Sequence, residues 1–99
     1  MPIFLVETFL SRSGAEERTA RERRARSAVE ELARRGTRVR FDHMIHVPED
    51  EICFFVFDAP SSRDAALAAQ LAELGAIRIV EAVSSVHSEE GNRTRKEET

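Results

Sequence analysis

The segment TRVRFDHMIHV at residues 37–47 leads through PED at 48–50 into EICFFVFD at 51–58, and this pair of runs decides the fold. Apolar and polar residues alternate in the first run, which is the pattern of a strand with two different faces. The second run is rich in aromatic and β-branched residues and is apolar on both faces. Proline leads the short connection between them, so a turn joins two successive strands.

Helices and further strands are predicted outside this pair. Residues 14–35 before it and residues 61–74 after it have helical periodicity, and a glycine follows each run. The runs at 3–9 and 76–83 have the composition of strands. Read along the chain, the expected order is strand, helix, strand, strand, helix, strand.

This order predicts an α+β fold of the ferredoxin-like βαββαβ type. Two right-handed crossovers give a four-stranded antiparallel sheet of order 4-1-3-2, with both helices on one face. We expect one domain over residues 1–83 and a disordered polar tail over residues 84–99, where the sequence is charged and aperiodic.

Such a sheet would leave one apolar face without cover. The first strand offers Ile3, Leu5 and Phe9 on one face and Phe4 and Val6 on the other, so both faces are apolar. A large uncovered apolar face is normally an interface. We therefore expect a symmetric homodimer in which two sheets pack face to face, as in dimeric α/β barrels.

Charge and composition limit the partners. The 99 residues carry 15 basic and 18 acidic side chains, for a net charge of −3, which argues against nucleic-acid binding. Arginines in residues 14–35 often stand four positions after a glutamate, as in solvated helix ion pairs. The opening MPIFLVETFL is too short and polar to span a bilayer, and the lone Cys53 permits no internal disulfide. We expect a cytoplasmic protein with neither nucleic acid nor membrane as a partner.

The two histidines of FDHMIH, residues 41–46, do not form a chelating motif. They are three positions apart on a strand, so they face opposite sides of the sheet. Regular alternation places His43 on the face of Phe41 and Ile45, and His46 on the other. Only His43 therefore interrupts an otherwise apolar face.

Glu7 interrupts an apolar face in the same way, and Glu81 does so in the last strand. A cavity lined by Glu7 and His43 would explain both interruptions and would suit a transition metal or proton transfer near neutral pH. The alternative left open is that the two groups lie at strand ends near solvent or hydrogen-bond each other. Cys53 is expected to be a buried, unreactive thiol.

The segments PIFLVE, VRFDHMIHVPEDEICFFVFDAPSS and AIRIVEAV resemble a family of small ferredoxin-like domains of unknown function. The resemblance covers about residues 2–83 and implies a dimeric α/β barrel-like protein, because one described member is a nickel-binding dimer. By this resemblance Glu7, His43 and Asp58 are the candidate metal ligands. The chain departs from the family at Phe41 and Met44 and lacks the histidine usual in the second helix.

These observations favour a small, soluble homodimeric ligand-binding protein that takes a divalent transition metal such as nickel through Glu7, His43 and Asp58. The alternative is a cofactor-free dimeric α/β barrel enzyme that acts on a small apolar molecule, with His43 and Glu7 as its acid/base pair. A third alternative is an interaction module whose histidines only pack. The expected partners are a second copy of the chain and a metal or small-molecule ligand.

Overall fold

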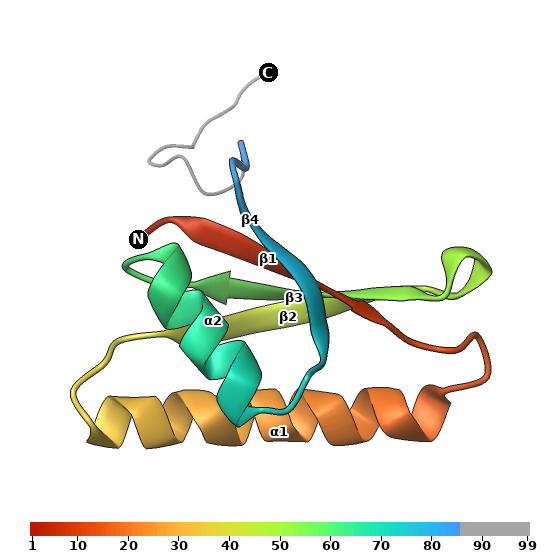
Figure 1. Cartoon of the computed structure of the whole chain (residues 1–99), viewed down its shortest axis with the longest axis horizontal. Helices are drawn as coiled ribbons and strands as arrows, with labels where there is room; N and C mark the ends of the chain where they lie inside the picture. The colour runs from red at the N-terminus through yellow and green to blue at the C-terminus, as the bar shows by residue number, and fades with distance from the viewer. Residues whose placement is uncertain (86–99) are drawn as a thin grey trace.

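The segments follow one another in the predicted βαββαβ order in the computed structural model, which describes residues 1–85 (Figure 1). They are β1 (Ile3–Phe9), α1 (Ala15–Arg34), β2 (Arg40–Val47), β3 (Ile52–Asp58), α2 (Ser62–Leu71) and β4 (Ala76–Ala82), with the short helix η1 (Pro48–Asp50) between β2 and β3. All strand pairs are antiparallel and the sheet order is β2-β3-β1-β4. This confirms the predicted fold and topology. Most of the predicted tail, from residue 86 on, lies outside the described residues.

Local signals set the ends of α2. The Ser61 side chain caps its first turn by accepting a hydrogen bond from the Asp64 amide at 3.2 Å. At the other end Ala72 is the C-cap and Glu73 directly after it has a φ of 54°, so the helix ends before Gly75, where the sequence had placed its terminator. No helix within residues 1–85 is both long enough and apolar enough to cross a membrane.

The core lies between the sheet and the two helices. Phe55 and Phe57 of β3 are fully buried, and the ring of Phe41 packs on them with centroids 6.1 and 5.4 Å away. The helices supply mostly small buried residues, which let their backbones approach the sheet: Ala25, Ala28 and Leu32 from α1, and Ala65, Ala68 and Ala69 from α2.

A β-bulge interrupts β2. Phe41 stands opposite Phe57 of β3, but His43 stands opposite the very next residue, Val56. Asp42 is therefore an extra residue with no counterpart on β3. Such an inserted residue shifts the alternation of the strand by one position.

The bulge changes which residues of β2 share a face. Phe41 and Met44 both pack against the core, and His46 follows Met44 on that side by alternation. His43 and Ile45 lie on the opposite face. The prediction that His43 opposes His46 and shares a face with Ile45 is confirmed. The prediction that His43 also shares a face with Phe41 is wrong. It assumed regular alternation, and the inserted Asp42 between the two residues moves His43 to the other face.

Within residues 1–85 neither helix covers the second face of the sheet, which we call the open face. By the strand register, its apolar side chains are those of Ile3, Leu5, Phe9, Ile45, Val47, Ile52, Phe54, Val56, Val80 and Ala82. Phe9 is 57% exposed and Ile45 is 46% exposed. A single chain therefore leaves large apolar side chains in contact with water.

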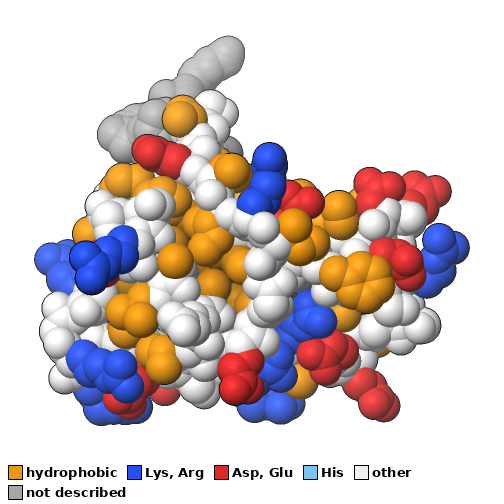
Figure 2. All heavy atoms as spheres, viewed as in Figure 1, with side chains coloured by type: hydrophobic (Ala, Val, Ile, Leu, Met, Phe, Trp, Pro, Cys, Tyr) orange, Lys and Arg blue, Asp and Glu red, His pale blue; other side chains and the backbone are white. Residues whose placement is uncertain are grey.

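Hydrophobic side chains also gather on the helix side, in the region of α2 and β4 (Figure 2). Ala66 and Ala69 of α2 and Ile79 of β4 line a groove of about 410 Å³ there. Gln70 and Glu73 line the same groove, so its wall is partly polar. This groove is separate from the open face, which lies on the other side of the sheet.

Candidate functional site

Glu7 lies in the middle of the open face, paired across the sheet with Phe54 of β3 and Arg78 of β4. Its Oε1 accepts a hydrogen bond from Nε of Arg78 at 3.0 Å. The glutamate side chain is only 21% exposed, so this charged partner offsets the cost of placing a carboxylate among apolar neighbours. The sequence analysis missed Arg78; its signal was an arginine in the middle of the apolar run AIRIVEAV.

His43 lies on the open face of β2, at the edge of the sheet. Its Nδ1 is 3.2 Å from Oδ2 of Asp42, the bulged residue that precedes it. The imidazole is 54% exposed, so solvent or a second molecule can reach it. The bulge thus presents His43 outward with a carboxylate directly beside it.

One chain does not bring Glu7 and His43 together. Glu7 shares a row of the sheet with Phe54 and Ile45, whereas His43 shares the next row with Val56. Two strand spacings of about 4.8 Å and one row of about 7 Å separate their backbones. In one chain the side chain of Glu7 is paired instead with Arg78, and that of His43 with Asp42.

Asp58, the third predicted ligand, lies at the far end of β3 and is 7% exposed. Its nearest cation is Arg40, with NH2 4.0 Å from Oδ2. The register places it four residues beyond Phe54, the partner of Glu7, so it does not join Glu7. Among residues 1–85 no three histidine, cysteine, aspartate or glutamate side chains come close enough to hold a metal ion. The assignment of Glu7, His43 and Asp58 as metal ligands therefore stays a prediction.

The helix side of the sheet carries a second set of reactive residues. His46 stands opposite Cys53, and its Nδ1 is 3.4 Å from NH1 of Arg18 on α1. Cys53 is fully buried, and its thiol points to the Met44 thioether at 4.0 Å. Burial raises the pKa of the Cys53 thiol, although the charges of Arg21 and Arg18 oppose this shift. The thiol is therefore held in its protonated form, as expected for an unreactive cysteine.

We expect Cys53 to resist alkylation by iodoacetamide at pH 8 in the folded protein and to react at once in denaturant. A thiol whose pKa is raised on folding stabilises the folded state at every pH below the ordinary thiol pKa of about 8.5. This stabilisation is lost as the pH rises above that value and through the raised pKa of the folded state. The free energy of unfolding should therefore fall above about pH 9. For each protein the fall is measured from its value at pH 7, and it should be smaller in Cys53→Ala than in the native chain. Rapid alkylation of the folded chain would contradict burial of the thiol.

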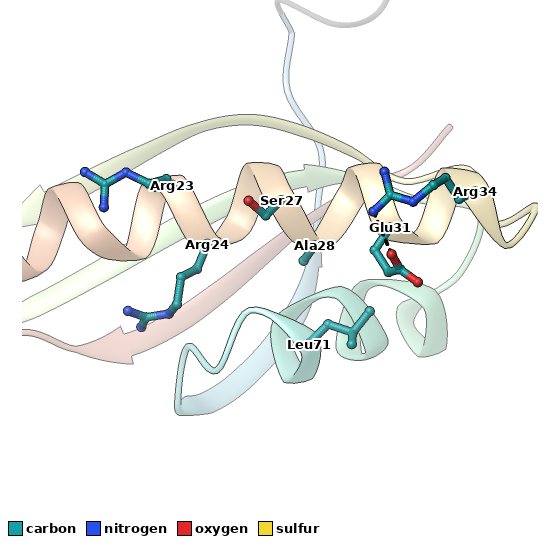
Figure 3. Close-up of a pocket in the computed structure, with 7 residues that line it drawn as sticks. All are labelled: Arg23, Arg24, Ser27, Ala28, Glu31, Arg34 and Leu71. Atoms are coloured by element: carbon teal, nitrogen blue, oxygen red, sulfur yellow. Dashed lines mark hydrogen bonds and ion pairs between the residues drawn. The ribbon is translucent and has the colours of Figure 1, made fainter.

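A second groove, partly lined by arginines, lies between the two helices. Its volume is about 400 Å³, and Leu71 reaches from α2 toward Ala28 of α1 in its centre (Figure 3). Arg24 donates hydrogen bonds to the carbonyls of Ala72 at 2.8 Å and Glu73 at 3.2 Å, just after α2 ends. These contacts join the helices and leave that arginine little capacity for a ligand.

Comparison with known proteins identifies a shared fold. No family model and no curated protein matches the chain. A crystal structure of SCO4226 from Streptomyces coelicolor A3(2) superposes with a TM-score of 0.66 at 18% sequence identity, covering 84% of this chain and 98% of that one. At this identity the likeness extends to the fold alone.

Proposed function

We propose that this chain works as a homodimer whose two open faces pack together around a binding space for a small molecule. The observation that carries this proposal is the open face itself, with Phe9 57% and Ile45 46% exposed beside other apolar side chains. Burying side chains of this size gains about 1.5–3 kcal/mol each. A second copy is the occupant we favour, because packed pairs of sheets bury two such faces at once.

The polar groups of the open face support a ligand space rather than a dry interface. Glu7, Arg78 and His43 all lie on this face, and their charged or polar ends require water or a polar ligand group. Two twisted sheets that pack face to face through their apolar side chains would leave room near such groups. The ligand class that suits this lining is a small, mostly apolar molecule with one polar end.

The experiment is sedimentation velocity on the full chain at micromolar concentration. A species of twice the 11.2 kDa chain mass is expected. A single 11.2 kDa species at that concentration would eliminate the proposal. The mass measurement does not depend on knowing the ligand.

A divalent metal such as nickel is a second candidate ligand of the dimer. It is favoured by the outward position of His43, whose imidazole is 54% exposed and could meet a carboxylate of the other copy. The acid/base enzyme is supported less well, because His43 and Glu7 are not within hydrogen-bonding reach in one chain. Both candidates rest on the dimer.

Elemental analysis of untagged protein tests the metal. If the two copies hold a metal through His43, we expect near-stoichiometric nickel after loading and dialysis, and its loss in His43→Ala. His46→Ala is the matched control, since His46 lies on the helix side and should leave the metal content unchanged. Nickel absent from the native dimer, or equal in both variants, would exclude this ligand and leave the dimer standing.

A further inference from the structure

A separate cavity lies where β3 ends, β2 begins and α1 comes to its last turn. Its volume is about 390 Å³, and its lining residues are Met1, Ala33, Arg38, Val39, Arg40 and Asp58. We call it the Asp58 cavity. All of these residues belong to one chain, so the cavity does not need a second copy to exist, although by the strand register Asp58 and Arg40 are on the same side of the sheet as the open face.

The carboxylate in this cavity lacks the partners that a buried charge needs. Asp58 is 7% exposed, and its Oδ1 is buried without any hydrogen-bond partner. Its Oδ2 is 4.0 Å from NH2 of Arg40, which is beyond hydrogen-bonding distance. Desolvating a carboxylate without donors is costly, so the cavity has an unmet requirement for a donor, preferably a cationic one.

Two guanidinium groups line the same cavity. Arg40 is opposite Asp58 in the sheet, and its side chain is 76% exposed. Within residues 1–85 the side chain of Arg38 makes no hydrogen bond or ion pair, so its donors remain available. Guanidinium groups bind carboxylates through paired hydrogen bonds.

One carboxylate beside two guanidinium groups is unsuited to either a simple cation or a simple anion. A metal cation would meet one carboxylate against two arginines, and a simple anion would face the Asp58 charge at close range. A molecule that carries one cationic and one anionic group close together satisfies both the carboxylate and the arginines. In an α-amino acid the ammonium and carboxylate are attached to the same carbon, which matches an acid and a base that lie 4.0 Å apart.

We propose that the Asp58 cavity binds a free α-amino acid, with the ligand ammonium on Asp58 and the ligand carboxylate on Arg38 and Arg40. Val39 and Met1 supply apolar lining for the ligand side chain. The volume of about 390 Å³ accommodates a medium-sized apolar amino acid such as leucine.

Calorimetric titration of the full chain with L-leucine tests this. Saturable binding is expected, and removal of either ligand charge, in N-acetyl-L-leucine or L-leucinamide, should weaken it by about tenfold or more. Equal binding of N-acetyl-L-leucine would show an anion site and overturn the proposal. Absence of saturation up to millimolar L-leucine would overturn it as well.

Variants identify the site. Asp58→Asn keeps the shape of the side chain and should remove leucine binding with the fold intact, as judged by circular dichroism. Arg38→Gln, at an exposed position, should weaken binding similarly, so the test survives if the first variant does not fold. Arg63→Gln on α2 is the control and should bind as the native chain does. Native-like binding by folded Asp58→Asn or by Arg38→Gln would contradict the assignment.

Discussion

Replacing Ile45 with glutamate is expected to give a folded monomer under conditions in which the native chain sediments as a dimer. Ile45 is 46% exposed in a single chain, so the fold itself loses little. In a symmetric dimer the change acts twice. Each copy loses about 1.5–3 kcal/mol of apolar burial and must place a carboxylate against an apolar face. The dimer dissociation constant should rise by at least about a hundredfold.

Leu67→Glu is the matched control for this experiment. Leu67 is also partly exposed, at 36%, but it lies on α2, on the opposite side of the sheet from the open face. This variant should remain dimeric at the same concentration. If both glutamate variants sediment as the native chain does, the open face is not the interface. If Leu67→Glu alone dissociates, the helix side is the interface.

Phe55→Ala should cause the largest loss of stability, about 3–5 kcal/mol in the free energy of unfolding. Phe55 is fully buried at the centre of β3 and packs with Phe41, so truncation removes both transfer energy and ring contacts. Stability of this size is a large part of what a small domain has. Urea denaturation followed by circular dichroism measures the change.

The same measurement on Leu71→Ala provides the comparison. Leu71 is 37% exposed on α2, so it leaves no closed cavity on truncation and should cost much less than Phe55→Ala. Both proteins should be compared at one concentration, because the proposed dimer would add to the apparent stability. Equal losses for the two variants would mean that Phe55 does not form the centre of the core.

The fold was readable from the sequence because its signals are local. Strand β1 runs over Ile3–Phe9 as predicted, and Gly36, the glycine that follows the first helical run, directly follows the C-cap of α1 with a φ of 88°. Periodicity, caps and terminators each act over a few residues, and the right-handed crossover rule then leaves one sheet order. The observed ends of the helices and strands differ from the predicted ends by only a few residues.

The arrangement of the polar residues was less predictable, since it depends on partners far apart in the chain. Arg78 reaches Glu7 across 71 positions, and no local pattern indicates that pairing. Asp58 stood out only through a resemblance, and its incomplete set of partners becomes visible only with Arg40 opposite it. Strand neighbours fix such distances, and periodicity says nothing about them.

The inserted residue at Asp42 has a consequence for comparing this protein with others. Because Asp42 shifts the strand by one position, odd-numbered residues such as Phe41 face the core before it, whereas even-numbered residues such as Met44 face the core after it. A relative without the insertion would be one residue shorter here and would still carry its histidine outward. A gapless alignment would then match His43 with an inward-facing position in that relative. Alignments of this strand should therefore place a gap at position 42, so that residues are matched by the face of the sheet they occupy.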